Sequence, residues 1–256
     1  MQRSGLVIFT VVLAAITFGC RKDEPAAEKP EPENAAIENR SETEAAMGTT
    51  LQWLGHASFR ISHKNQVIYI DPWKIKDSPH DATFVLVSHS HYDHYSPVDI
   101  ARVSGPKTKL IASADVTAKQ KDGEPILPGL TIELEGITVQ GVAAYNPHKQ
   151  FHPKGNNWNG FIIQAGSKQI YYAGDTDLTD EMKAVKDIDV ALLPVGGTYT
   201  MDSQDAAEAT RHINPKSAIP YHWGDIVGGR NDAEAFAKAA SCKVNILTPG
   251  QTINLE

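Results

Sequence analysis

The sequence is short of cysteine, has no excess of positive charge and contains no apolar run long enough to cross a membrane. Its two cysteines, Cys20 and Cys242, lie far apart, which argues against a disulfide framework or a cysteine-based zinc site. The formal net charge of -7 argues against the basic surface that holds nucleic acid. What remains is an ordinary globular composition, with 41% hydrophobic and 21% charged residues in 256, enough for one large domain or two small ones.

Residues 1–20 have the layout of a secretory signal peptide. An apolar run over residues 6–18 follows a basic start, and it is shorter than the about 20 residues of a membrane-spanning helix. A small residue before Cys20 resembles a bacterial lipobox, in which the cysteine is lipidated and becomes the mature N-terminus, although Thr17 stands where leucine is usual. This layout predicts export to the periplasm with a lipid anchor at Cys20. Plain secretion is the alternative.

Residues 21–47 form a polar segment with eight acids, four bases and almost no large apolar side chains. Such a segment cannot bury enough surface to become ordered, and its three prolines favour an extended chain. The sequence therefore predicts a disordered linker between the anchor and one folded domain over residues 48–256.

Strand-like and helix-like segments follow a pattern along this domain. Strands are expected over residues 49–54, 57–62, 66–71, 82–88, 109–113, 189–196, 217–223, 243–250 and 251–256. Residues 130–145 are expected to form two strands broken near Gly136, and residues 159–175 a hairpin that turns at Gly166 and Ser167. Helices are expected over residues 96–105, with Ser96 as N-cap and Pro97 in the first turn, and over 113–123, 179–187, 202–213 and 231–240. Apolar strands that alternate with helices indicate an α/β fold, a four-layer αββα sandwich of two mixed sheets.

The stretch Ser88–His94, "SHSHYDH", is the densest group of metal-binding side chains in the chain. His89 and His91 are two residues apart, so at the end of a strand both point to one face. Asp93 and His94 lie on the turn that follows. Imidazoles and a carboxylate suit zinc, iron or manganese, but a two-metal site needs more ligands than this loop supplies.

Further candidate ligands follow other strands. Asp175 comes after an apolar strand and a glycine, where a carboxylate can bridge two ions, and His222 ends another apolar strand. A loop after the strand that ends at Tyr145 offers two histidines, His148 and His152. Residue pattern alone leaves the choice between these two open.

Taken in order, these residues resemble the metallo-β-lactamase superfamily, whose signature H-x-H-x-D-H is matched by residues 89–94. The later "GDT" at Gly174–Thr176 and the strand-end His222 also resemble this superfamily. The stretches "LQWLGHASFRI", "VIYIDPW" and "LLPVGGTYTMDSQDAAEA" are similar to its branch of lactonases and metal-dependent hydrolases. The resemblance covers nearly all of residues 50–256.

The resemblance implies a site for two divalent metal ions, with zinc ranked ahead of manganese and iron. It implies that the first ion is held by His89, His91 and one further histidine. His152 is preferred over His148 because related sequences place a histidine before proline there. The resemblance implies that the second ion is held by three side chains with a carboxylate between the two ions: Asp93, His94 and His222, with Asp175 between.

The expected activity is hydrolysis of a small-molecule lactone, ester, amide or phosphodiester by water that two ions activate, with Asp93 also catalytic. A lactone or small ester ranks ahead of a phosphodiester on the resemblance alone. A non-hydrolytic di-iron redox protein or metal-dependent binding protein of the same fold is the alternative. The oligomeric state has no signal in the sequence.

Other polar and aromatic residues near these motifs have weaker assignments. Three are candidates to orient ligands or to be structural: His56, Asp71 and Thr176. Four flank the site and either shape a pocket or pack in the core, the latter slightly favoured: Tyr145, Tyr199, Tyr221 and Trp223. Three histidines in polar surroundings are expected at the surface: His63, His80 and His212.

Overall fold

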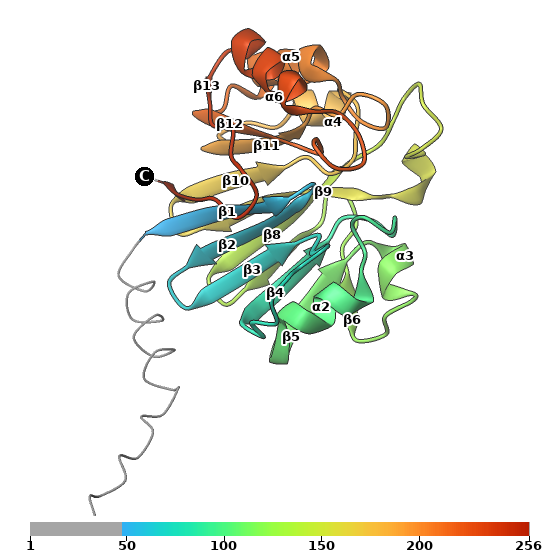
Figure 1. Ribbon diagram of the computed structural model, residues 1–256. Coiled ribbons are helices and arrows are strands. Elements are labelled where there is room, and N and C mark those ends of the chain that lie inside the picture. Colours follow the sequence, from blue (N-terminus) through green and yellow to red (C-terminus); the bar gives the residue numbers. More distant parts are fainter. Residues whose placement is uncertain (1–47, 256) are drawn as a thin grey trace, which may run out of the picture.

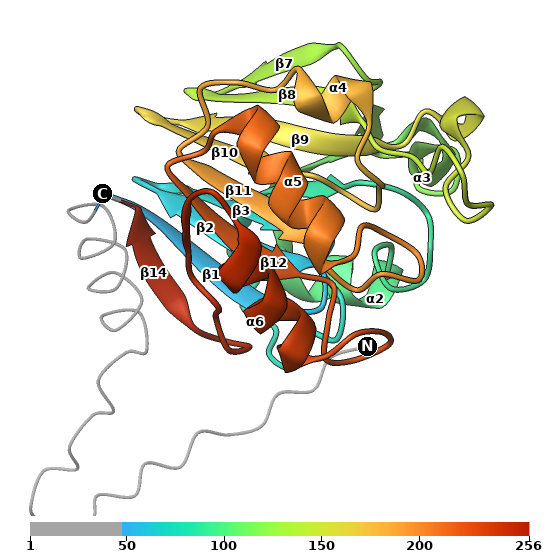
Figure 2. The ribbon, with the colours of Figure 1, turned by 90° about the horizontal axis from the view of Figure 1, so that it is seen from above.

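The computed structural model describes residues 48–255, so the expected signal peptide, Cys20 and the linker over residues 21–47 lie outside the described residues. Within that range the chain forms two seven-stranded sheets packed face to face, with helices on both outer sides (Figures 1 and 2). The expected four-layer αββα sandwich is confirmed. None of the helices in this range is long and apolar enough to span a membrane.

The first sheet joins the N-terminal strands to the last strand of the chain. Its strands are β1 (Thr49–Gly55), β2 (Ser58–His63), β3 (Gln66–Ile70), β4 (Ala82–Val87), β5 (Ser104–Ala112), β6 (Gly123–Pro125) and β14 (Thr252–Leu255). They lie in the order β14-β1-β2-β3-β4-β5-β6. The pairs from β14 to β3 are antiparallel, and those from β3 to β6 are parallel.

The second sheet also has an antiparallel part and a parallel part. Its strands are β7 (Thr131–Leu134), β8 (Ile137–Ala143), β9 (Asn159–Ala165), β10 (Lys168–Tyr172), β11 (Val190–Pro194), β12 (Ser217–Tyr221) and β13 (Lys243–Val244). The order is β13-β12-β11-β10-β9-β8-β7. The pairs from β13 to β10 are parallel and those from β10 to β7 antiparallel, so each sheet is half parallel and half antiparallel.

Helices cover the outer faces. They are α2 (Pro97–Val103), α3 (Ala114–Thr117), α4 (Asp180–Lys183), α5 (Ser203–Ile213) and α6 (Arg230–Ala239), with one 3₁₀ turn, η1 (Lys154–Asn156). The predicted N-cap is confirmed, because the Ser96 side chain accepts a hydrogen bond from the backbone N–H of Asp99. Asp202 caps α5 in the same way.

Three expected elements are shorter than the sequence suggests. The helix expected over residues 113–123 is only the single turn α3, because Gly123 starts β6 instead of ending a helix. A Cβ atom on Gly123 would lie 3.0 Å from Thr117 Cγ2 and 3.2 Å from Leu110 Cδ2, so glycine gives this tightly packed strand start the most room. The helix expected over residues 179–187 is likewise only α4.

The strand expected over residues 243–250 ends at Val244, because the chain must cross from the second sheet to the first before β14. The Gly250 N–H donates to Trp53 O on β1 at 2.7 Å, which marks the arrival of the chain at the first sheet.

The main hydrophobic core lies between the two sheets and draws buried side chains from both of them. They include Phe59 and Ile70 of the first sheet and Phe161, Ile163 and Leu192 of the second. A smaller cluster packs α2 against the outer face of the first sheet. The two sheets therefore hold each other rigidly, and the strand ends between them can carry a precise arrangement of side chains.

Candidate metal centre

Each predicted ligand comes directly after a strand or in a loop that follows one. His89 follows β4, Asp175 follows β10, and His222 is the first residue after β12. His152 lies in the loop between β8 and β9. Segments far apart in the sequence therefore bring their polar side chains to one place between the two sheets.

Three of the predicted ligands form one group, here called the His89 group: His89, His91 and His152. Their candidate ligand atoms all lie within 4.8 Å of one another, and His89 Nε2 lies 3.0 Å from His91 Nδ1. His89 and His152 are buried, whereas His91 is half-buried. The ring of Trp158 packs beside the rings of His89, His91 and His152, with centroids 4.8, 4.9 and 5.6 Å away.

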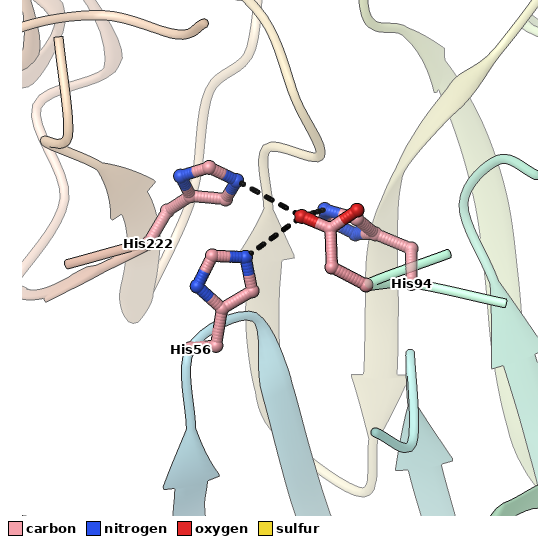
Figure 3. A group of neighbouring side chains, drawn as sticks. His56, His94 and His222 are labelled. Carbon is pink, nitrogen blue, oxygen red and sulfur yellow. Dashed lines mark hydrogen bonds and ion pairs between the residues drawn. The ribbon is translucent and has the colours of Figure 1, made fainter. Parts of the chain in front are cut away.

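A second group, here called the His94 group, contains four residues whose candidate ligand atoms lie within 4.8 Å of one another: His56, Asp93, His94 and His222. His56 Nε2 lies 3.0 Å from Asp93 Oδ2, and the Nε2 atoms of His94 and His222 lie 3.7 and 4.0 Å from the same oxygen. Figure 3 shows the rings of His56, His94 and His222 converging from different segments of the chain. His56 is therefore inside the site.

Asp175 lies between the two groups and is 3% exposed. Its Oδ2 is 3.3 Å from His152 Nε2 and 3.2 Å from His222 Nε2, while Oδ1 is 3.3 Å from His94 Nε2. One carboxylate thus faces histidines of both groups, which is the arrangement that a bridging ligand requires.

The loop after β8 presents His152 to the site and leaves His148 exposed. Asn146 Oδ1 accepts hydrogen bonds from the His152 backbone N–H at 3.0 Å and from His152 Nδ1 at 2.8 Å. Because a backbone N–H can only donate, the amide atom facing it is the oxygen, and His152 therefore carries its proton on Nδ1. His152 Nε2, 3.3 Å from Asp175 Oδ2, is the ring nitrogen left to face the site.

Lys149 also holds this loop in place. Its Nζ donates to Asp177 Oδ1 at 2.6 Å and to the carbonyls of Gly197 and Thr200 at 3.0 and 2.6 Å. One ammonium group thereby ties the loop of His152 to two other loops around the site.

Asp71 orients His94 from the side away from the other ligands. Its fully buried carboxylate accepts hydrogen bonds from His94 Nδ1 at 2.7 Å and from Tyr172 Oη at 2.6 Å. Ser88 adds its backbone N–H at 2.7 Å and its hydroxyl at 2.5 Å, and that hydroxyl also lies 2.9 Å from His89 Nδ1. These contacts fix the ring of His94 so that Nε2 faces Asp175.

The charges in the site are strongly coupled. Burial lowers the pKa of His89 well below its usual range. Burial would also lower the pKa of His94, but the carboxylates of Asp175 and Asp71 outweigh it and hold that pKa well above its usual range. Burial would raise the pKa of Asp175, but the imidazoles of His222 and His94 hold it well below. Positive charge is therefore favoured at this point of the site, beside the buried carboxylates of Asp71 and Asp175.

Three residues of the site have a left-handed backbone that non-glycine residues seldom adopt. His56, Asp71 and His222 have φ angles of 47°, 43° and 59°. Gly174, before Asp175, has a φ of 72°, and a Cβ atom there would lie 2.6 Å from Asn159 O. Such conformations persist only where the surrounding structure enforces them, as it does at these strand ends.

The remaining sequence candidates lie around the site in structural roles. The buried Tyr221 hydroxyl donates to Gly174 O at 2.6 Å, and the Trp223 ring packs against that of Trp53 with centroids 5.0 Å apart. The Thr176 hydroxyl, next to Asp175 in the chain, bonds to the backbone of Tyr145 and Asp177.

The other two flanking tyrosines and the three outlying histidines also have partners away from the ligands. Tyr145 Oη donates to Glu181 at 2.8 Å, and Tyr199 packs against Phe151. His80 is exposed; His63 and His212 are half-buried, contacting Thr49 and Glu208.

Four residues support the site without having been predicted from the sequence: Trp158, Asn146, Ser88 and Lys149. Ser88 and Asn146 offered a signal, since a polar residue next to a ligand motif is a natural hydrogen-bond partner for an imidazole. Trp158 and Lys149 offered none, because their contacts depend on how loops distant in sequence meet.

The donor atoms fit divalent metal ions. Four buried atoms that face one another have no hydrogen-bond partner in the described part of the chain: His94 Nε2, His152 Nε2, His222 Nε2 and Asp175 Oδ1. The three nitrogens converge on the Asp175 carboxylate at 3.2–3.3 Å, so a cation that all of these atoms can bind suits the site. Imidazole nitrogens with carboxylate oxygens are the donor set of zinc, manganese and iron sites.

Fold and site together define a class of protein, and comparison with known proteins identifies it. Residues 50–222 match the family described as the Beta-lactamase superfamily domain. A UPF0173 metal-dependent hydrolase of Saccharolobus solfataricus is 34% identical over 231 residues, covering 80% of this chain and 99% of the relative. The UPF0173 metal-dependent hydrolase of Caldivirga maquilingensis is 32% identical and covers 80% of this chain and 97% of its own.

Solved structures agree. The crystal structure of a putative metal-dependent hydrolase from Parabacteroides distasonis superposes with a TM-score of 0.70 at 30% identity, covering 79% of this chain and 94% of that one. Igni18, a metallo hydrolase from Ignicoccus hospitalis, gives a TM-score of 0.68 at 26% identity, with 81% and 98% covered. The chain belongs to the metallo-β-lactamase superfamily and, within it, to the UPF0173 metal-dependent hydrolase family. The enzyme class expected from the histidine motif, a metal-dependent hydrolase, is thereby confirmed.

Proposed function

We propose that the chain holds two divalent metal ions between its sheets and hydrolyses a neutral carbonyl compound, a lactone or a small ester. The observation that carries this proposal is the convergence of unpartnered imidazole nitrogens from two groups on the single buried carboxylate of Asp175. The His89 group would hold one ion, and Asp93, His94 and His222 the other, with Asp175 between them. When bound, such ions supply Lewis acidity and lower the pKa of water toward neutrality.

Asp93 is the residue best placed to move a proton. Its side chain is 11% exposed, whereas that of Asp175 is 3% exposed and enclosed by histidines. Burial would raise the pKa of Asp93, but the hydrogen bond from His56 and the charge of His94 lower it, so the group is ionised at neutral pH. Asp93 can therefore accept the proton that water loses as it attacks the carbonyl carbon, and then give it to the alkoxide that leaves.

Exposed aromatic side chains next to the ligands favour an uncharged substrate. Tyr92, between His91 and Asp93, is 68% exposed, and Phe151, before His152, is 44% exposed. The Tyr92 ring packs edge-on against Trp73, and the Phe151 ring against Tyr199, with centroids 6.2 and 4.7 Å apart. Such exposed apolar surface beside a polar centre suits the apolar part of a ligand.

The lysines closest in sequence to this surface are not available to bind a phosphate. Lys74 Nζ contacts both carboxylate oxygens of Asp225 at 2.8 and 2.9 Å. Lys149 is neutralised by Asp177. A neutral ester or lactone is therefore favoured over a phosphodiester.

Elemental analysis and a substrate panel test the proposal on the full chain. We expect about two metal ions per chain under metal-replete conditions, and turnover of nitrophenyl esters and lactones exceeding that of bis-nitrophenyl phosphate. His152→Ala should lower both metal content and turnover, whereas His148→Ala, a matched control in the same loop, should leave both unchanged.

Less than one ion per chain, or equal losses in the two variants, would overturn the proposal. Bound iron with a visible absorption band and no turnover of any ester, lactone or phosphodiester would favour the non-hydrolytic di-iron alternative.

A further inference from the structure

We infer that His56 is a positioning residue, which holds the Asp93 carboxylate in the His94 group and couples it to His222. The inference deepens the proposed function and rests on it, because the carboxylate that His56 orients is a proposed ligand and proton carrier.

The orientation of the Asp93 carboxylate depends on His56. In the described range, the Asp93 carboxylate has one hydrogen bond, from His56 Nε2 to Oδ2 at 3.0 Å. The Nε2 atoms of His94 and His222 lie farther from this oxygen, at 3.7 and 4.0 Å. Asp93 also sits in a turn between β4 and α2, where neighbouring backbone gives a side chain little direction. His56 therefore decides where Oδ2 points.

His56 is itself held rigidly. Its backbone carbonyl accepts hydrogen bonds from Trp53 Nε1 at 3.0 Å and from the His222 N–H at 3.1 Å. Its ring lies against that of His222, with centroids 4.1 Å apart, and beside Trp73 at 5.2 Å. With 3% exposure and a φ of 47°, the residue has a strained backbone that these contacts enforce.

The hydrogen bond to Asp93 leaves His56 the role of a positioning residue. A nitrogen that donates its proton to Asp93 has no lone pair to offer a metal ion, so His56 Nε2 acts through the carboxylate. The bond from the His222 N–H to the His56 carbonyl joins the end of β12 to the turn after β1, which belong to different sheets. The position of Asp93 is therefore linked to the packing of the two sheets.

Two substitutions separate the hydrogen bond from the backbone. Asparagine tolerates a left-handed backbone better than most residues, but its side chain is too short to reach Asp93, so His56→Asn removes the hydrogen bond and keeps the turn. Glutamine places an Nε2 donor at a reach similar to that of histidine, so His56→Gln restores the hydrogen bond. His80→Asn is a matched control, because His80 has a φ of 49° and is exposed.

Titration of the metal-free proteins with Co²⁺, followed by calorimetry and visible absorption, reads out the role independently of activity. We expect His56→Asn to bind one ion with the affinity of the original chain and the second about 10- to 100-fold more weakly, with an altered absorption band. His56→Gln should recover most of the second affinity, and His80→Asn should match the original chain. The melting temperature of each metal-free protein shows that the variants fold.

Unchanged second-ion affinity and turnover in His56→Asn would overturn the inference. So would a loss in His56→Gln equal to that in His56→Asn, since it would assign the effect to ring packing. If the original chain itself binds less than one ion, the proposed function fails; if it binds two and the variants do not differ from it, only the role of His56 fails.

Discussion

Asn146 is the residue whose removal tests most directly how the loop after β8 presents His152. In Asn146→Ala, the His152 backbone N–H and Nδ1 lose their shared acceptor, and Tyr199 O loses the amide donor that lies 3.0 Å away. The backbone bond from the Asn146 N–H to His152 O, at 2.8 Å, remains. The substitution therefore removes three hydrogen bonds without deleting the loop contact itself.

The magnitude follows from these bonds. A net contribution of about 0.5–1.5 kcal/mol per hydrogen bond gives a loss of roughly 2–4 kcal/mol in the free energy of unfolding, since the site is buried and water replaces the amide only in part. His152 also loses the contact that fixes its tautomer, so affinity for one metal ion should fall about 10- to 100-fold.

Urea denaturation of the metal-free protein measures the first effect, and competition with a chelator measures the second. Asn146→Asp separates the two effects, because it keeps the acceptor for both His152 donors but buries a charge and sets a second oxygen against Tyr199 O, so stability should fall while the orientation of His152 is kept. The role of Asn146 is refuted if Asn146→Ala unfolds at the urea concentration of the original chain and competes equally well for metal, or if Asn146→Asp loses more metal affinity than Asn146→Ala.

Three further predictions concern other parts of the molecule. Gly174→Ala places a Cβ atom 2.6 Å from Asn159 O at a φ of 72°, so the melting temperature and metal content should both fall, and normal values for both would contradict the clash. Asp115, which accepts a hydrogen bond from Trp158 Nε1 at 2.9 Å, has a pKa below its usual value, because hydrogen bonds from Ser113 and Trp158 outweigh the effect of burial. Its contribution to stability should be fully present above its unfolded-state pKa of about 3.9 and disappear as the pH falls through the lower folded-state pKa, so the stability difference between the original chain and Asp115→Asn should shrink on acidification in urea titrations. Lipidation of Cys20 stays a prediction of the sequence: the original chain should then take up a palmitate probe and Cys20→Ala should not, and an original chain that takes up no probe would contradict it.

Much of the sandwich could be expected from the sequence, because strand runs with apolar residues on both faces report burial between layers. β10, β11 and β12 are of this kind. The short elements could not be expected: residues 243–250 are apolar enough for a strand, yet they must cross between sheets, and that requirement comes from the topology alone.

The candidate site divides in the same way. Residues that are close in sequence, such as His89 and His91, predict a metal-binding site through their spacing. The involvement of His56 depends on the packing of the turn after β1 against the end of β12, a contact between distant segments that no local spacing encodes. The side of the loop on which His148 lies is likewise set by contacts that local spacing does not encode, namely the hydrogen bonds of Asn146 with His152 and of Lys149 with Asp177.

The two halves of the chain contribute unequal but complementary shares of the site: His56, His89, His91, Asp93 and His94 from the first sheet, and His152, Asp175 and His222 from the second. Ions held among them would act as a reversible cross-link between two sheets, which in residues 48–255 have only the free Cys242 and therefore no disulfide between them. At a free metal concentration of 100 times the dissociation constant, each such ion adds about 2.7 kcal/mol to the stability of the folded state. The free metal concentration would then set the free energy of unfolding of the two-sheet domain, as well as its activity.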